Sequence, residues 1–237
     1  RAVGDVLGRA APADAAPSHG GERPPHPGDA AVSQATAALR RAYRDRLTAI
    51  VADDLTSANP IEHVPTVCRR MTELADAALD AALLVARAVV GPQADDVALA
   101  VIAMGKTGAR ELNYISDVDV VGPTHEACGA QEPISEERLV EVGTHVATEL
   151  AHVVSATAPE PPLWPLDTAL RPEGKDGALV RTLDSHLAYY RRWAASWEFQ
   201  ALLKARACAG DAELGVRYEQ GVAPYVWEAS RRENFVE

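Results

Sequence analysis

Two aspartates one residue apart, Asp117 and Asp119, follow a glycine-rich turn and are the residues best suited to metal chemistry. We expect both in a strand, where side chains at positions i and i+2 project from the same face. Two carboxylates held that close repel each other, and a divalent cation removes this cost. Mg²⁺ prefers oxygen ligands, usually one or two protein carboxylates together with phosphate oxygens. The pair therefore predicts a magnesium site.

The turn before the pair predicts contact with phosphate. It contains Gly105, Lys106 and Gly108, and Ser116 directly precedes the first aspartate. Glycine lets a backbone approach a phosphate closely and point its N–H groups at the ligand. We assign these four residues to the binding of a nucleotide or phosphate whose metal the aspartates hold.

A third carboxylate would complete a two-metal site, in which two ions clamp the attacking and leaving oxygens. Asp167 is the candidate, because it lies in an apolar segment where an unpaired carboxylate would be costly. Arg171 and Lys175 follow it and are candidates to neutralise phosphoryl oxygens. A structural ion pair of Arg171 with Glu173 or Asp167 is the alternative.

Helices are expected to precede and follow this region. Apolar residues recur at helical spacing in residues 32–55 and again from Pro60 to Val89, before a stop at Gly91-Pro92. The first helix also carries a basic face, which could meet phosphate or an acidic partner but is more often simply solvated. Its basic residues are Arg40, Arg41, Arg44 and Arg46.

The apolar run Val97–Met104 predicts a buried strand. Further strands are expected at residues 117–121, 163–170 and 179–181, and further helices at residues 139–153 and 184–208. Helices, then strands, then helices predict an α+β fold with a mixed sheet. We divide the chain into a linker, a helical lead-in, a catalytic core and a C-terminal helical segment, at residues 1–31, 32–92, 93–183 and 184–237.

Composition narrows the class of protein. Among 237 residues, 34 are acidic and 23 basic, a net charge of −11, which disfavours general nucleic-acid binding. No apolar run reaches the roughly 20 residues that span a bilayer. The three cysteines are far apart and form no CxxC pair, and there is no signal peptide, so we expect a cytoplasmic location. We also expect the chain, which begins at Arg1, to be a fragment.

Two strings closely resemble the bacterial bifunctional glutamine-synthetase adenylyltransferase/adenylyl-removing enzymes: GKTGARELNYISDVDVV and LRPEGKDGALVRTLDSHLAYYRRWAASWEFQALLKARACAGD. The resemblance runs from about Val97 to Asp211. The spacing from Gly105 to Asp117 and Asp119 also resembles the nucleotidyltransferase superfamily related to DNA polymerase β, with Lys106 where serine is usual. The resemblance implies a nucleotidyltransferase-like fold.

The family has two such halves. One adds AMP from ATP to a tyrosine of glutamine synthetase, and the other removes it by phosphorolysis, which yields ADP. The strings ELNYISDVD and RPEGKDGALV are more similar to the N-terminal, adenylyl-removing half. The resemblance makes Asp117, Asp119 and Asp167 the metal-binding acids. It also implies Mg²⁺, ATP or ADP and inorganic phosphate as ligands, glutamine synthetase as partner, and control by a small nitrogen-signalling protein and glutamine.

One stretch departs from the family pattern. After Val121 the family strand continues with apolar residues, whereas this chain has Gly122-Pro123-Thr124-His125. Proline is a poor residue for a central strand, so either a loop is deleted here or residues are missing from this chain, and the position of Asp119 relative to Asp167 stays open.

Two other functions remain open at this point. Forward adenylyl transfer from ATP would use the same three acids. A non-catalytic, nucleotide-sensing regulatory module would explain the long helical lead-in and the break after Val121. An antibiotic-type nucleotidyltransferase acting on a small molecule lacks support from the strings that follow Asp167.

Overall fold

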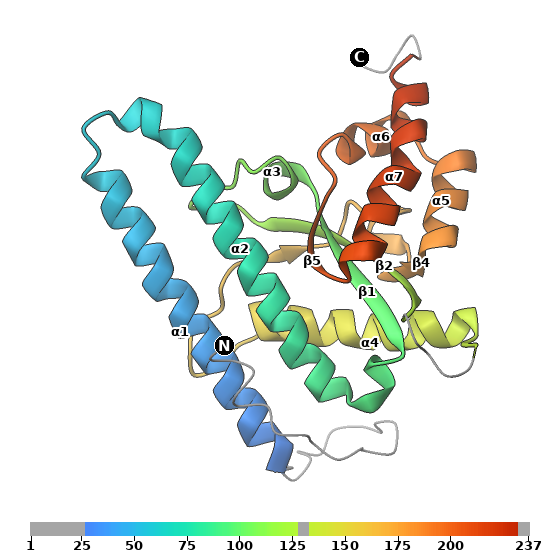
Figure 1. Cartoon of the computed structure of the whole chain (residues 1–237), viewed down its shortest axis with the longest axis horizontal. Coiled ribbons are helices and arrows are strands. Elements are labelled where there is room, and N and C mark those ends of the chain that lie inside the picture. The colour runs from blue at the N-terminus through green and yellow to red at the C-terminus, as the bar shows by residue number, and fades with distance from the viewer. Residues whose placement is uncertain (1–26, 128–132, 232–237) are drawn as a thin grey trace.

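The computed structural model describes residues 27–127 and 133–231, and these form three layers with a sheet in the middle (Figure 1). Helices α2 and α4 cover one face of the sheet, and α1 packs along α2. Helices α5, α6 and α7 lie on the other face. The helical bounds are α1 Pro27–Leu55, α2 Pro60–Val90, α3 Gly105–Gly108, α4 Glu136–Ser155, α5 Leu183–Arg192, α6 Ser196–Leu202 and α7 Ala212–Ala229, with single 3-10 turns η1 Pro92–Ala94 and η2 Gly174–Asp176.

The sheet is mixed, as predicted for an α+β fold. Strand β1 is central and runs antiparallel to both β2 and β5, whereas β3 and β4 pair in parallel with β2 at successive positions along it. The strand bounds are β1 Val97–Ala103, β2 Val118–Glu126, β3 Leu166–Asp167, β4 Val180–Thr182 and β5 Arg206–Gly210.

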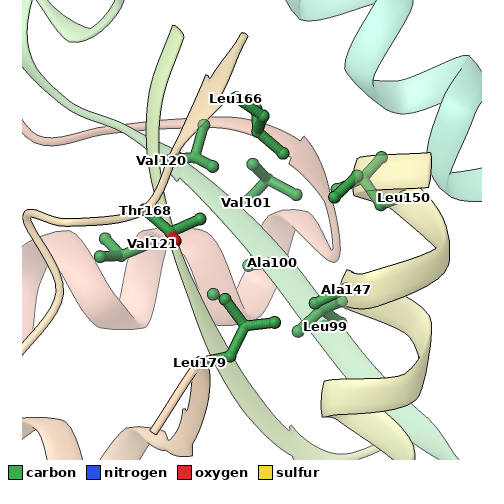
Figure 2. A pocket seen from close by; sticks show the side chains of 12 residues that line it. Leu99, Ala100, Val101, Val120, Val121, Ala147, Leu150, Leu166, Thr168 and Leu179 are labelled. Carbon is green, nitrogen blue, oxygen red and sulfur yellow. The ribbon is translucent and has the colours of Figure 1, made fainter. Parts of the chain in front are cut away.

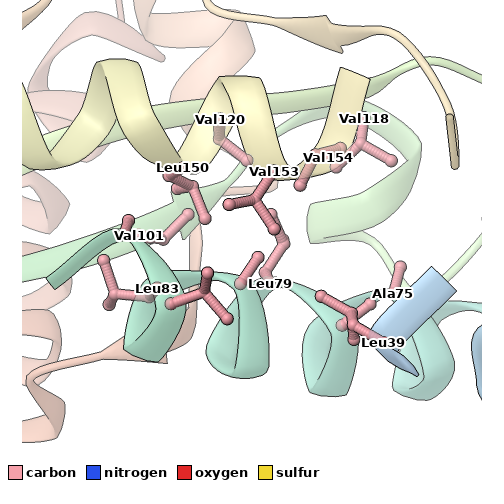
Figure 3. Close-up of a cluster of buried hydrophobic side chains, with 14 of the residues drawn as sticks. Leu39, Ala75, Leu79, Leu83, Val101, Val118, Val120, Leu150, Val153 and Val154 are labelled. Carbon is pink, nitrogen blue, oxygen red and sulfur yellow. The ribbon is translucent and has the colours of Figure 1, made fainter. Parts of the chain in front are cut away.

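Strand β1 separates two hydrophobic cores. Val97, Leu99 and Val101 pack toward α2 and α4, whereas Ala98 and Ile102 pack toward α5, α6 and α7. Figure 3 shows Val101 facing the side chains of these two helices. This alternation is the two-residue period of a strand, and both sets are apolar because both faces are covered. Full burial of a valine or leucine side chain contributes about 1.5–3 kcal/mol, so β1 fixes the sheet that carries the acidic residues.

The long helices have the boundaries that local chemistry favours. Pro60 occupies the first turn of α2, where its missing N–H costs nothing, and Gly91 ends the helix with φ of +85°. Ser135 caps α4 by accepting a hydrogen bond from the N–H of Arg138. The predicted helices over residues 32–55, 60–89 and 139–153 and the strand over residues 97–104 are confirmed.

No helix within residues 27–127 and 133–231 has the length and apolar character that a membrane crossing requires. Helix α1 begins at Pro27, five residues before Val32, so residues 27–31 of the expected linker are helical. Residues 1–26 of that linker lie outside the described part of the chain.

The expected helix over residues 184–208 is wrong in its second half. Helix α5 ends at Arg192, α6 is a separate short helix, and Arg206–Gly210 forms β5 on the edge of β1. The alanine-rich sequence of β5 favours a helix locally, but the free edge of β1 provides a partner that helical propensity does not anticipate.

The strand expected over residues 117–121 starts one residue later, after Asp117, and does not stop at Val121, because β2 spans Val118–Glu126. The pairing with β1 links Ile102 to Val121 and Leu99 to Thr124 and skips Pro123, which lies opposite Arg181 of β4 instead. The expected strand over residues 163–170 shrinks to Leu166–Asp167.

Buried His186 makes stability depend on pH. It is 1% exposed, its ring lies edge-on to Tyr218 at 5.3 Å, and burial, followed by the charge of Arg181, lowers its pKa to about 3. The unfolded chain takes up a proton at this residue near pH 6.5 and the folded chain does not. The free energy of unfolding should therefore fall as pH drops from about 6.5 toward 3, by up to about 1.4 kcal/mol per pH unit.

Urea unfolding at a series of pH values checks this. In the variant His186→Phe, which keeps a planar ring, the free energy of unfolding should depend less steeply on pH than in the unmodified chain. The variant His145→Gln, at an exposed position, should keep the dependence of the unmodified chain. An unchanged slope in His186→Phe contradicts the assignment.

Candidate metal centre

Asp117, Asp119 and Asp167 converge, as predicted: each offers a carboxylate oxygen, and these oxygens all lie within 4.8 Å of one another. The parallel pairing of β2 with β3 brings them together, because it sets Asp119 opposite Asp167. The N–H of Val118 also donates to the carbonyl of Pro165 at 3.1 Å, which fixes the register one step earlier.

The electrostatics of this cluster suit a cation. The pKa of Asp119 is raised, first by burial and then by the negative charges of Asp117 and Asp167, while nearby Lys106 acts in the opposite direction. Three hard oxygen donors at such distances match the ligands of one Mg²⁺ or of two ions about 3.5–4 Å apart. Within the described residues the cluster contains no histidine or cysteine, so the donor set favours Mg²⁺ over zinc.

Gly105 makes room for one of these carboxylates. Its φ is +51°, and a β-carbon at this position would overlap the Oδ2 atom of Asp119. Only glycine combines this left-handed conformation with so close an approach. The neighbouring N–H of Met104 donates to the carbonyl of Asp119 at 2.9 Å, so the turn and the aspartate are held together.

Lys106 and Ser116 lie beside the acids, as the sequence predicts. The Nζ atom of Lys106 is 3.3 Å from the Oγ atom of Ser116, and that hydroxyl donates to Asn113 at 2.8 Å. Asn113 also accepts from the N–H of Ile115 at 3.1 Å, so its side chain shapes the loop that ends at Asp117. Asn113 was not among the residues predicted for the site, although its place shortly before the acidic pair is typical of such a turn.

Gly108 is fixed by contacts within the chain, and its part in binding phosphate stays a prediction. Its N–H donates to the carbonyl of Met104 at 2.7 Å within α3, so this donor does not point toward a ligand. A β-carbon here would overlap the carbonyl of Lys204, so glycine is required for packing against the chain that leads into β5. Arg206 supports the same turn by donating to the carbonyl of Thr107 at 3.0 Å.

Asp76 on α2 holds that arginine in place. It pairs with Arg206 at 2.8 Å, and each side chain is 18% exposed. This pair was not predicted, because Arg206 was expected in a helix. The hydroxyl of Thr107, also missed, is buried and has no hydrogen-bond partner among the described residues.

Arg171 binds carbonyl groups of its own loop, and its contact with phosphate stays a prediction. Its guanidinium donates to the carbonyls of Thr168 at 2.8 Å, Lys175 at 2.8 Å and Gly177 at 3.0 Å, so it ties together the loop after β3. Neither acid proposed as its ion-pair partner binds it, and Glu173 pairs instead with Arg181. Lys175 is exposed on η2, and its contact with phosphate stays a prediction.

An apolar cavity of about 120 Å³ lies between the sheet and α4 (Figure 2). Leu166 and Thr168, the neighbours of Asp167, line it together with Leu150 of α4. Sites for small-molecule ligands usually occupy about 300–1,000 Å³, so this cavity does not hold a nucleotide.

Comparisons with known proteins agree on one family. The family model described as "Glutamate-ammonia ligase adenylyltransferase" matches residues 22–221. A protein of Bifidobacterium longum (strain DJO10A) is 47% identical over 208 residues, which cover 86% of this chain and 19% of that protein. A protein of Leifsonia xyli subsp. xyli is 50% identical over 216 residues, covering 87% and 21%. A protein of Mycolicibacterium smegmatis is 51% identical over 210 residues, covering 86% and 20%.

All three relatives carry the name "Bifunctional glutamine synthetase adenylyltransferase/adenylyl-removing enzyme". The chain spans about a fifth of the length of these curated relatives.

The geometry at Gly105 predicts a selective loss of metal affinity. Gly105→Ala should displace the Asp119 carboxylate and weaken Mg²⁺ binding by about 10–100-fold, as measured by isothermal titration calorimetry. Gly174→Ala is the matched control: its φ is +61°, but the nearest atom to an added β-carbon is 3.7 Å away. Backbone strain is thus common to both variants, and equal Mg²⁺ affinities in the two would contradict the proposed contact.

Proposed function

Since this chain belongs to the glutamate-ammonia ligase adenylyltransferase family, we propose that its acidic site acts on an adenylyl group carried by glutamine synthetase. The observation that carries the proposal is the convergence of three carboxylates within 4.8 Å, two of them on the paired parallel strands β2 and β3 and the third, Asp117, just before β2. The names of the relatives support glutamine synthetase as the protein partner.

The proposed direction is removal of AMP by phosphorolysis. An oxygen of inorganic phosphate forms a bond to the adenylyl phosphorus, and the bond from that phosphorus to the tyrosine oxygen breaks. The departing phenolate takes up the proton of hydrogen phosphate, and the products are ADP and unmodified tyrosine. Support for this direction comes from the strings ELNYISDVD and RPEGKDGALV, which are more similar to the adenylyl-removing half of the family.

This reaction needs no protein base, because phosphate is already anionic at neutral pH. A mechanism without a protein base is consistent with the acidic cluster, which is composed of three aspartates. Catalysis then depends on positioning and on compensation of charge.

Each residue of the site has a proposed task. Asp117, Asp119 and Asp167 hold Mg²⁺, which when bound neutralises the charge that accumulates on the phosphoryl oxygens. Lys106 lies close enough to Asp119 to affect its pKa, and its ammonium group would bind the non-bridging oxygens of phosphate or nucleotide. Ser116 orients that lysine through their contact at 3.3 Å.

Forward transfer of AMP from ATP is the second candidate, because it would use the same three acids and the names of the relatives contain both activities. Unmodified glutamine synthetase incubated with the chain and α-labelled ATP discriminates between the two directions. Label on the synthetase would favour transfer. Release of ADP from the adenylylated synthetase, dependent on phosphate, would favour removal.

Replacement of one acid tests the proposed chemistry. Asp117→Asn or Asp119→Asn should lower the rate of ADP formation from adenylylated glutamine synthetase and phosphate by at least about 100-fold, because charge compensation is lost. Circular dichroism checks that each variant is folded. Asp45→Asn, an exposed change on α1, is the control and should retain the full rate. Undiminished turnover in either site variant would overturn the assignment.

A further inference from the structure

Arg40 on α1 is fully buried, with 0% exposure, although it was expected on a solvated basic face. Its guanidinium donates to the carbonyls of Val153 at 2.8 Å, Ala156 at 2.9 Å and Glu160 at 2.8 Å. It also lies 3.3 Å from the carbonyl of His152. Burial of a charged group is costly unless it is well hydrogen-bonded, so this arrangement is specific.

The acceptors explain why an arginine stands there. Helix α4 ends at Ser155, and the last carbonyls of a helix have no partner within it and carry its partial negative charge. Arg40 therefore caps α4 from a different helix. The planar guanidinium of Arg40 also donates to Glu160, in the segment that follows the helix. A lysine carries a single ammonium group and cannot bind the helix end and Glu160 at the same time.

Other residues of α1 bind the same segment. Arg41 pairs with the carboxylate of Glu160 at 2.8 Å, and Arg44 binds the other oxygen of that carboxylate. Tyr43 accepts a hydrogen bond from the indole of Trp164 at 3.0 Å. The residues that connect α4 to β3 are thus attached to α1 along most of their length.

This segment leads directly to Asp167. The hydroxyl of Ser155 donates to the carbonyl of Trp164 at 3.0 Å, and Pro165 then accepts from Val118. Strand β3 itself consists of Leu166 and Asp167 alone, and after it the Asp167 carboxylate accepts a hydrogen bond from the N–H of Ala169 at 2.7 Å. A ladder that short is weak by itself, so the backbone on both sides of it must help to hold the carboxylate against the repulsion of the other two, and the α4–β3 segment is the side that α1 binds.

We propose that Arg40 is a positioning residue for the acidic site: by capping α4 and binding the α4–β3 segment, it holds Asp167 where the three carboxylates can share a cation. The inference rests on the proposed metal site but not on the direction of the reaction. Arg40 touches neither the acids nor a substrate, and it acts through the backbone that carries Asp167.

The test measures Mg²⁺ affinity of the chain by isothermal titration calorimetry. Arg40→Lys keeps the positive charge and loses the fork, and it should weaken Mg²⁺ binding by about 10–100-fold, the range for residues that orient metal ligands. Arg46→Lys, an exposed change on the same helix, should leave the affinity unchanged. Tyr218→Phe removes a buried hydroxyl contact of 3.3 Å with Tyr190 in the opposite core, so it lowers stability without reaching Asp167.

A loss of affinity in Arg40→Lys but not in Tyr218→Phe supports positioning over a general loss of stability. High Mg²⁺ concentrations should restore ADP formation in Arg40→Lys and not in Asp167→Asn, because only the second variant lacks a ligand. If Arg40→Lys does not fold, Arg40→Gln serves instead, since it keeps hydrogen-bond donors but is too short to reach Val153, Ala156 and Glu160 together, and it should weaken Mg²⁺ binding in the same direction. If the folded variant binds Mg²⁺ as tightly as the unmodified chain does, the inference is overturned, whether or not the variant forms ADP.

Discussion

Mutual repulsion among three carboxylates is the constraint around which this chain is organised. Asp117, Asp119 and Asp167 lie within 4.8 Å of one another, and burial together with its two neighbours raises the pKa of Asp119. A folded chain holds like charges this close only when other interactions in the structure outweigh their repulsion. At the site itself, the pairing of β2 with β3 and the left-handed glycine at position 105 keep the carboxylates in place.

The layers of the fold support the acidic site in different ways. Strand β1 joins two hydrophobic cores, and the core formed with α1, α2 and α4 lies behind the acids. Helix α1 does more than cover this core, because its arginines bind the segment that delivers Asp167. Helix α2 supports the glycine turn from the other side through the pair of Asp76 with Arg206. Elements far apart in the sequence thus converge on one small site.

Sequence reasoning succeeded where one local signal decides the structure. Helical periodicity located α2 and α4, and an uninterrupted apolar run located β1. Asp117 and Asp119 do lie close together, although Asp117 precedes β2 and is not part of the strand expected to hold both. Sequence reasoning failed where a distant partner decides. The alanine-rich residues of β5 form a strand only because they pair with the edge of β1. The sequence around Arg40 is that of an ordinary surface arginine, and only the fold shows that Arg40 binds the C-terminal end of α4. Gly108 is required by the nearby Lys204 carbonyl, which no local pattern reveals.

The central claim is that the three carboxylates bind a divalent cation. A crystal structure of the chain grown with Mn²⁺, with anomalous scattering recorded to locate the ion, tests it most directly. The account predicts an anomalous peak about 2.0–2.4 Å from an oxygen of Asp117, Asp119 and Asp167, the range for hard cations bound by oxygen. Mn²⁺ bound only elsewhere, or a structure in which Asp167 is turned away from the other two acids, would contradict the claim.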